Sequence, residues 1–286
     1  MPNKWHGQTI RVGLGSYAFR YAVGFSGFQP PQPMKLNDFL AAAAELGYEG
    51  VQLCENLRYS GHPRDSLLAA AEQARELGLF VELGMRDLGG ETLRRHLEIA
   101  EVFGSRLIRL VLGAESAFPE KQPQRMKESA VKILTNALGE LRDLDVIVGL
   151  ENHFDLASDD LLSIVEEVGD SRVGLILDTT NGLGFLEKPE VTLAKFIPHL
   201  VSIHLKDYQI RKVEAGYFVT GTALGEGLLD VKGILRNVLG TRRPLSIIVE
   251  LTTRRTDDLT DILAWEADMN YRSMNSLRQM IREMEA

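Results

Sequence analysis

The chain has 286 residues, of which 44% are hydrophobic and 25% are charged, as in globular proteins with one large core. Its 32 Lys and Arg residues against 40 Asp and Glu residues give a formal charge of −8, which disfavours a nucleic-acid-binding surface because such a surface needs an excess of basic groups. The single cysteine, Cys54, excludes an intrachain disulfide and a thiolate-rich metal cluster, and no apolar run approaches the ~18 residues of a membrane span.

The first ten residues carry Lys4, Trp5 and His6 and lack the apolar stretch of a signal peptide, so we expect a cytoplasmic protein. Eight short runs rich in Val, Ile and Leu follow along the chain, and they have the length and composition of strands buried on both faces of a parallel sheet. These runs cover residues 10–15, 50–54, 79–83, 106–113, 146–151, 173–178, 200–205 and 245–251.

Amphipathic segments with helix start and stop signals lie between these runs. Asn37 is placed to cap a helix that ends at Gly47, and Asp230 is placed to cap a helix over 231–239. Pro189 suits the first position of another helix. The segment 207–229 is long for a loop between a strand and a helix, and its alternating residues predict a short hairpin over the mouth of the fold.

Eight strands that alternate with helices predict a (β/α)₈ TIM barrel of the α/β class, in a single domain over 1–286 because no linker-like segment interrupts the chain. An open, doubly wound sheet has the same alternation and is the rival fold. The residue pattern of the last four strands favours a closed barrel. Successive strand residues alternate faces, so Glu151 shares its face with Gly149 and Ile147, and large and small residues on this face alternate from strand to strand.

The inward face of each of these four strands ends in a polar side chain. The four residues are Glu151, Asp178, His204 and Glu250. Any one of them alone would most simply form a salt bridge, a helix cap or a buried hydrogen bond. Three buried carboxylates at one mouth, however, would raise one another's pKa unless a cation lay among them. Together with one imidazole they predict a site for one divalent ion, with Mn²⁺ as the first choice and Mg²⁺, Co²⁺ or Zn²⁺ as alternatives.

Five segments of the chain resemble one known superfamily. They are VGLENH (148–153), LILDTTN (175–181), SIHLKD (202–207), GEG (225–227) and IIVEL (247–251). The superfamily is that of the xylose isomerase-like TIM barrels, and the resemblance is to its sugar phosphate isomerase/epimerase group. It implies that the four strand-end residues bind one divalent ion and that Glu151 and Glu250 exchange protons with the substrate. It also implies that His153 and Lys206 contact the substrate.

The sequence departs from this family at one informative position. Asn181 stands where many members carry a His that helps to hold substrate oxygens in the ketose epimerases, so Asn181 is a candidate substrate contact and epimerase activity does not carry over directly. The related endonuclease IV group needs additional His ligands for three zinc ions. His62 and His96, in a predicted loop and helix, do not supply them.

Further polar groups follow the predicted strands. Arg254 lies four residues after Glu250 and is another candidate substrate contact, whereas Lys206 either contacts the substrate or pairs with Asp207. Arg86 and Arg109 face either the mouth or the helices; if two such cations converge, the substrate is an anion or a polyol. Candidate contacts to substrate hydroxyls are Ser16, Tyr17, Glu55 and Asn56.

These features predict a metal-dependent isomerase or epimerase of a small sugar, keto-sugar or sugar phosphate, which moves a proton beside a carbonyl through an enediolate. A dehydratase or lyase of a keto-cyclitol, keto-sugar or dehydroshikimate-type compound shares the first step and stays an alternative, as does a non-catalytic metal- or sugar-binding barrel. The expected partner is a small carbohydrate-type molecule, without nucleic acid or membrane, and homo-oligomer formation stays open.

Overall fold

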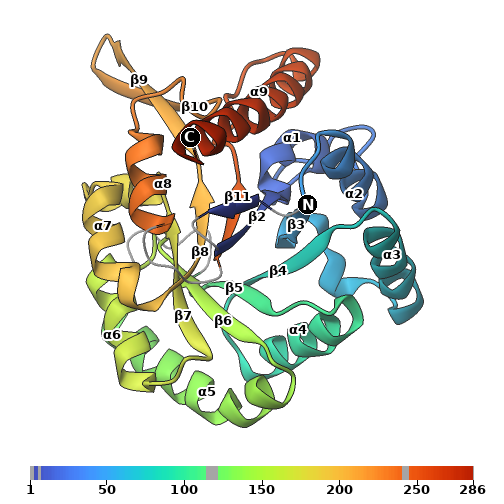
Figure 1. Cartoon of the computed structure of the whole chain (residues 1–286), viewed down its shortest axis with the longest axis vertical. Helices are drawn as coiled ribbons and strands as arrows, with labels where there is room; N and C mark the ends of the chain where they lie inside the picture. The colour runs from blue at the N-terminus through green and yellow to red at the C-terminus, as the bar shows by residue number, and fades with distance from the viewer. Residues whose placement is uncertain (1–2, 6–7, 114–121, 240–244, 286) are drawn as a thin grey trace.

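The computed structural model describes residues 3–5, 8–113, 122–239 and 245–285 of the chain. Eight parallel strands form a ring in which each strand pairs with two neighbours (Figure 1). In ring order they are β2 (Gln8–Gly15), β3 (Gly50–Leu53), β4 (Phe80–Arg86), β5 (Leu107–Val111), β6 (Ile147–Glu151), β7 (Val173–Asp178), β8 (Leu200–Leu205) and β11 (Leu245–Val249). Because β11 pairs with β2 and β2 pairs with β3, the sheet closes on itself. The predicted TIM barrel is therefore confirmed, and the open sheet is excluded.

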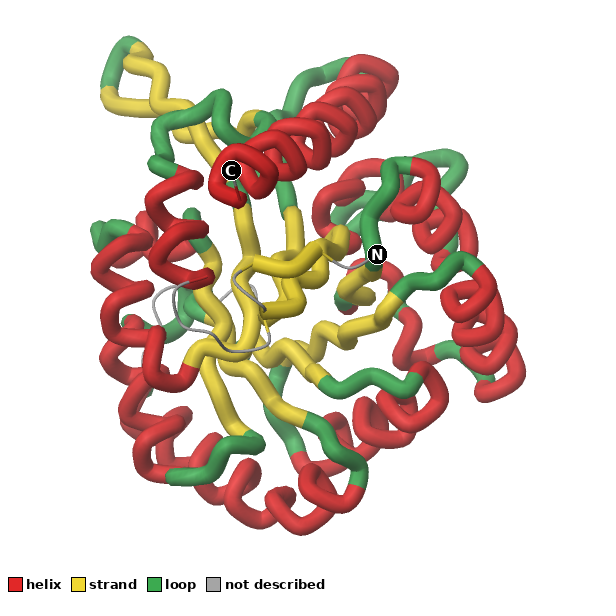
Figure 2. The backbone as a smooth tube through the Cα atoms, in the orientation of Figure 1, coloured by secondary structure: helices red, strands yellow, loops and turns green. Residues whose placement is uncertain are grey.

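Helices surround this ring, as Figure 2 shows in red around the yellow strands. They are α1 (Arg20–Val23), α2 (Leu36–Glu45), α3 (Arg64–Glu76), α4 (Gly90–Phe103), α5 (Pro123–Asp143), α6 (Ser158–Val168), α7 (Pro189–Phe196), α8 (Val231–Leu239) and α9 (Leu259–Glu285). The outward side chains of the strands, such as Val148, Leu150 and Leu175, are fully buried and belong to one core with the inner faces of the helices.

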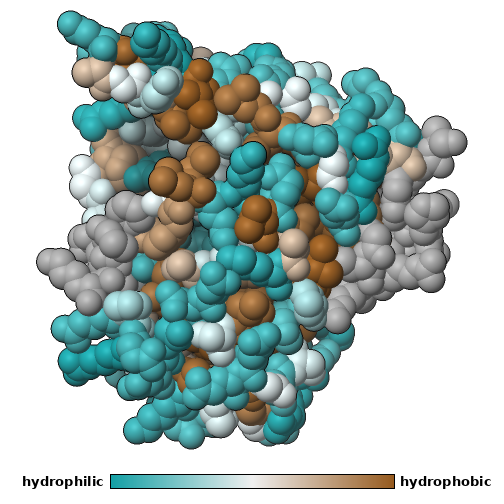
Figure 3. All heavy atoms as spheres, turned by 90° about the vertical axis from the view of Figure 1, so that its left-hand side faces the viewer, coloured by the Kyte–Doolittle hydropathy of each residue, from teal (hydrophilic) through white to brown (hydrophobic). Residues whose placement is uncertain are grey.

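On the face of the molecule in Figure 3, hydrophobic residues are scattered among hydrophilic ones, as on an ordinary protein surface. No helix in the described ranges is long and apolar enough to cross a membrane.

The predicted helix starts are confirmed at two of three positions. Pro189 is the first residue of α7, and Asp230 accepts a hydrogen bond from the backbone N–H of Gly233 (2.9 Å), as a cap of α8 should. The prediction for Asn37 is wrong, because α2 begins at Leu36 and Asn37 lies inside it. Asp38 accepts the N–H of Lys35 (3.0 Å), so its carboxylate satisfies a helix start whose cap position is Lys35, two residues before Asn37.

The interior of the barrel has the predicted alternation of large and small residues. Gly149 pairs with Gly174, and a Cβ at Gly149 would lie 2.7 Å from Cδ1 of Ile176, so the isoleucine of the next strand fills the space that the glycine leaves. Gly13 and Ile248 have the same relation, with 2.8 Å between the added Cβ and Cδ1. The interior is thus a packed core that supports the strand ends and leaves no channel at these levels.

A hairpin outside the ring and the long last helix complete the fold. Strands β9 (Asp207–Val213) and β10 (Gly216–Thr222) form the predicted hairpin, but it projects outward at the upper left of Figure 1 instead of lying across the strand ends, and Tyr217 near its tip is 76% exposed. The long helix α9 packs against the segment after β2, where Glu266 accepts the backbone N–H groups of Tyr21 (2.8 Å) and Ala22 (3.1 Å). Burial raises the pKa of Glu266 to about 7.

Candidate active site

The ends of three neighbouring strands bring the predicted metal ligands together. Glu151 ends β6, Asp178 ends β7 and His204 lies near the end of β8; all three are buried, and one ligand atom of each lies within 4.8 Å of the others. Glu250 directly follows β11, and its Oε1 lies 3.8 Å from Nδ1 of His204. The carboxyl ends of parallel strands meet at one end of a barrel, which explains why residues about 100 positions apart converge here.

The segment Asp178–Asn181 forms a turn that orients the Asp178 carboxylate. Its Oδ1 accepts the backbone N–H groups of Thr180 (2.8 Å) and Asn181 (2.9 Å). Asn152, on the neighbouring strand end, holds the backbone of Asp178 on both sides: it accepts the N–H (2.6 Å) and donates to the C=O (3.0 Å). These bonds use Oδ1 and the backbone, so Oδ2 is left to face the cluster.

Lys206 points into the same cluster, as its spacing of two from His204 predicts. Its Nζ lies 2.7 Å from Oδ2 of Asp178 and 3.0 Å from Oε2 of Glu250. The alternative pairing with Asp207 is wrong, because Asp207 accepts the backbone N–H groups of Gly225 and Gly227, both at 3.0 Å. Burial would lower the pKa of Lys206, but Asp178 and Glu250 outweigh burial and raise it, so the amine stays protonated.

Two arginines on the neighbouring strands also face the mouth. Arg109 of β5 donates through Nε to Oε2 of Glu151 and lies 3.4 Å through Nη1 from Oε2 of Glu55. Arg86, the last residue of β4, donates through Nε to Oε1 of the same Glu55 (2.8 Å), and the Tyr17 hydroxyl lies 3.3 Å from that oxygen. The question of which way the arginines face is therefore answered: both converge on Glu55.

The charges of the cluster shift one another's pKa. Burial would raise the pKa of Glu151, but Arg109 and His204 hold it well below its usual value. Burial and the neighbouring Glu151 raise the pKa of Asp178 in spite of Lys206. Burial would lower the pKa of His204, yet Glu151 and Glu250 raise it. Carboxylates are thus crowded at this mouth, as the sequence predicts, and a divalent ion would relieve that repulsion.

The polar atoms of the cluster fit such an ion. Nδ1 of His204, the ring nitrogen that Glu151 and Glu250 approach, and Oε1 of Glu250 are buried and form no hydrogen bond within the described ranges. Buried polar atoms without partners are rare in proteins, so these two call for a ligand. Carboxylate oxygens with one imidazole nitrogen form a donor set that Mn²⁺, Mg²⁺, Co²⁺ and Zn²⁺ accept. Glu151, Asp178 and His204 therefore form a candidate metal site, with Glu250 beside it.

The remaining predicted substrate contacts have different surroundings. Asn181 is buried and donates to Oε1 of Glu151 (3.0 Å). His153 is half-buried; burial lowers its pKa to about 3 although Glu151 opposes this, so its ring is neutral. Arg254, in the segment between β11 and α9, is exposed, and the structure does not bring it into the cluster.

Sequence reasoning left the direction of Arg109 open and missed Asn152. The register of β5 supplies a signal for the arginine: Arg109 pairs with Gly84 on one side and Gly149 on the other, and two glycines leave room for a long inward side chain. Asn152 has no such signal, because its two bonds to Asp178 depend on the pairing of β6 with β7.

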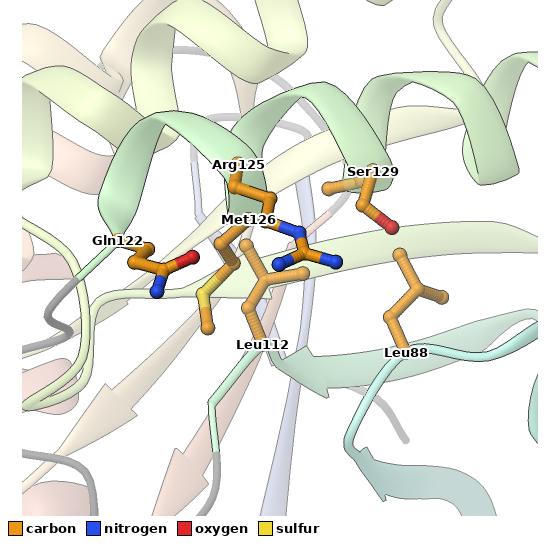
Figure 4. Close-up of a pocket in the computed structure, with 7 residues that line it drawn as sticks. Leu88, Leu112, Gln122, Arg125, Met126 and Ser129 are labelled. Carbon is orange, nitrogen blue, oxygen red and sulfur yellow. The ribbon is translucent and has the colours of Figure 1, made fainter.

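A separate cavity of about 310 Å³ lies between α5 and the segments that follow β4 and β5 (Figure 4). It is lined by Leu88, Leu112, Gln122, Arg125, Met126, Ser129 and Ala130. None of the candidate ligands or substrate contacts lines it, so it is distinct from the cluster at the strand ends.

Comparison with known proteins supports the barrel fold. Residues 40–274 match the sequence model of the family described as xylose isomerase-like TIM barrel, which is most of the chain. The chain belongs to this family. This xylose isomerase-like barrel is 27% identical over 243 residues to the 3-oxo-isoapionate decarboxylase of Pectobacterium atrosepticum, and the match covers 84% of this chain and 85% of the relative.

Two solved structures of the same fold are similar over nearly the whole chain. A D-psicose 3-epimerase crystallised in the presence of D-fructose has a TM-score of 0.74 and 14% identity, and covers 96% of this chain and 100% of its own. A xylose isomerase-like TIM-barrel protein from Mycobacterium smegmatis in complex with magnesium has a TM-score of 0.71 and 14% identity, and covers 99% and 100%. At this identity the two structures support the fold, and a sugar-modifying enzyme is consistent with the family as a whole.

Proposed function

We propose that this family member is a divalent-metal-dependent isomerase or epimerase of a small sugar, keto-sugar or sugar phosphate. Glu151, Asp178, His204 and Glu250 would hold the ion, with Mn²⁺ as the first choice. The observation that carries the proposal is the approach of two glutamates to one imidazole: Glu151 lies 3.4 Å and Glu250 lies 3.8 Å from Nδ1 of His204, and they come from different strands. Relatives of this fold include a D-psicose 3-epimerase and a magnesium complex.

A divalent ion bound here would stabilise negative charge on adjacent substrate oxygens. The protein's own groups then have separate tasks. Of the two oxygens of Glu250, one would bind the ion and the other would accept a proton from the carbon beside the carbonyl. Oε1 is buried and forms no hydrogen bond with the described residues, and Oε2 lies beside Nζ of Lys206. The protonated Lys206, 3.0 Å from Glu250, can donate a hydrogen bond to a substrate oxygen that gains charge. His153, which is neutral, can bind a hydroxyl without adding charge to the mouth.

Glu151 is the proposed second proton carrier, on the other side of the substrate. Return of the proton to the neighbouring carbon gives an isomer, and return to the opposite face of the same carbon gives an epimer. Both oxygens of Glu151 already accept hydrogen bonds, Oε1 from Asn181 (3.0 Å) and Oε2 from Arg109. For proton transfer, one of these bonds has to open when substrate binds.

This asymmetry between the glutamates favours a second candidate, a lyase that needs no second proton carrier. Dehydration beside a carbonyl starts when a single base, here Glu250, removes a proton, and hydroxide then leaves from the next carbon. Decarboxylation beside a carbonyl needs no base, because the enolate forms as CO₂ leaves and afterwards takes up one proton. The relative from Pectobacterium atrosepticum is named as a decarboxylase, which is consistent with this candidate. A panel of keto-sugars and keto-acids separates the two, because only the lyase releases water or CO₂.

The experiment is deuterium exchange from heavy water into a ketose panel, with and without Mn²⁺, read by NMR. We expect exchange that depends on the ion and falls by ~10²–10⁴-fold in Glu250→Gln and in Glu151→Gln. Glu140→Gln, on the exposed face of α5, is the matched control and should exchange like the wild type. Exchange that is insensitive to chelation, or that survives in both glutamine variants, would refute the proposal.

A further inference from the structure

Arg86 and Arg109 form a pair of cations beside the candidate metal site. Both guanidinium groups contact one carboxylate, Glu55, at 2.8 Å from Nε of Arg86 and 3.4 Å from Nη1 of Arg109. Their side chains are only 12% and 3% exposed. Burying two like charges together is costly unless anions compensate them, and here Glu55, together with Glu151 beside Arg109, supplies the compensation.

The charge balance of the whole cluster also favours an anionic substrate. Glu55 and Glu151 contact the two arginines, and Asp178 and Glu250 contact Lys206, so four carboxylates face three cations. A divalent ion would turn the resulting single negative charge into a single positive one. A substrate with one anionic group would neutralise that charge.

The donors of the arginines are also not all in use. The bonds that the described residues accept from the pair involve Nε and Nη1: Arg86 reaches Glu55 and the C=O of Gly113 (3.4 Å), and Arg109 reaches Glu151 and Glu55. Nη2 of either arginine forms no hydrogen bond or ion pair with the described residues. A guanidinium offers five N–H groups in a planar fork, which carboxylates and phosphates both match, and of the two the singly charged carboxylate fits the charge balance of the cluster.

We propose that Arg86 and Arg109 bind a carboxylate of the substrate, so that the preferred substrates are sugar acids with a keto group instead of neutral ketoses. This inference rests on the proposed function, because the metal site fixes the hydroxy-carbonyl end of the molecule and the arginines bind its acid group. Glu55 keeps the two guanidinium groups together before the substrate arrives. A purely structural bridge between β4, β5 and β6 is the competing explanation.

Two probes that differ in one group test the proposal. D-fructose and D-fructuronate have the same ketone, and the second carries a carboxylate at carbon 6 in place of the hydroxymethyl group. Binding of each to the Mn²⁺-loaded protein is measured by calorimetry. We expect the acid to bind at least ~10-fold more tightly than the ketose in the wild type, as one charge-assisted bidentate contact would give.

Three variants assign the preference to the arginines. Arg86→Gln should weaken binding of the acid by ~10–100-fold and change binding of the ketose by less than ~2-fold. Arg86→Lys keeps the charge and the contact to Glu55 but loses the fork, so its preference should be intermediate. Arg106→Gln is the matched control and should behave like the wild type, because Arg106 directly precedes β5, at the end of the strand away from the mouth, and is exposed beside Asp145 (3.2 Å). Affinity for Mn²⁺ shows whether each variant retains the metal site.

Equal affinity for the two probes in the wild type would overturn the inference, and so would an equal loss for both probes in Arg86→Gln. The outcome is separable from that of the proposed function. Ion-dependent deuterium exchange without a preference for the acid leaves the proposed function intact and removes the carboxylate site. If the protein exchanges no deuterium but prefers the acid, and Arg86→Gln abolishes this preference, the carboxylate site stands and the proposed function is refuted.

Discussion

Replacing Gly15 with alanine is expected to displace Glu250. Gly15 ends β2, next to β11, and a Cβ at this position would lie 2.6 Å from both Cγ and Oε1 of Glu250. Ordinary van der Waals contact begins at about 3.4 Å, so the carboxylate has to move by about 0.8 Å. The backbone of Gly15 has φ −80° and ψ 141°, which alanine adopts without strain, so the added methyl group acts through this contact.

The magnitude depends on how a displacement of this size affects proton transfer. A reacting group misplaced by about 1 Å can cost ~10²-fold in rate, and a weakened metal ligand lowers the affinity for the ion as well. The side chain of Glu250 is flexible, so overpacking should cost no more than ~1–3 kcal/mol of stability. We therefore expect a large loss of deuterium exchange in a protein that still folds.

The assay compares exchange rate, Mn²⁺ affinity and urea denaturation in the wild type and in Gly15→Ala. Gly139→Ala is the matched control: a Cβ there meets open space within α5, and alanine in a helix interior should raise stability by ~0.5–1 kcal/mol without changing exchange. If Gly15→Ala retains the exchange rate and the Mn²⁺ affinity of the wild type, the position assigned to Glu250 is wrong.

Three further predictions concern the ion, the fold and pH. Asp178→Asn should abolish the rise in melting temperature that Mn²⁺ gives the wild type, because it removes one ligand; an undiminished rise would contradict its role. Asp207→Asn should cost ~1–3 kcal/mol, because the buried carboxylate accepts three part-buried backbone N–H groups of the 225–229 loop; denaturation curves that coincide with the wild type would count against this. Because burial raises the pKa of Glu266 to about 7, its protonated form stabilises the fold fully below about pH 4.5, and this stabilisation is lost as the pH rises through about 7. Between about pH 4 and pH 8 the wild type should lose about 3 kcal/mol relative to Glu266→Gln in urea denaturation, and parallel pH curves for the two proteins would refute the assignment.

Much of the barrel is determined by local sequence pattern. The alternation of side chains along a strand is a property of the strand itself, so the shared face of Gly149 and Glu151 follows from their spacing alone. The ends of the strands depend on pairing with neighbouring strands and not on local sequence alone. β4 continues to Arg86, three residues beyond the predicted end, because its last residues pair with β5 through Val111. The start of α2 shows the same limit, since the contact between Asp38 and Lys35 outweighs the capping preference of Asn37.

The candidate site likewise has one part that the sequence pattern determines and another that depends on the tertiary structure. The sequence by itself determined that Glu151, Asp178 and His204 end their strands on the inward face, and parallel strands bring such ends to one mouth whatever the length of the intervening helices. Only the tertiary structure decided that Lys206 contacts Asp178 instead of its neighbour Asp207, and that Arg86 and Arg109 converge on Glu55. These contacts join side chains 28 to 54 positions apart in the chain, and ion pairs depend on distances of a few ångströms that no residue pattern encodes before the ring closes.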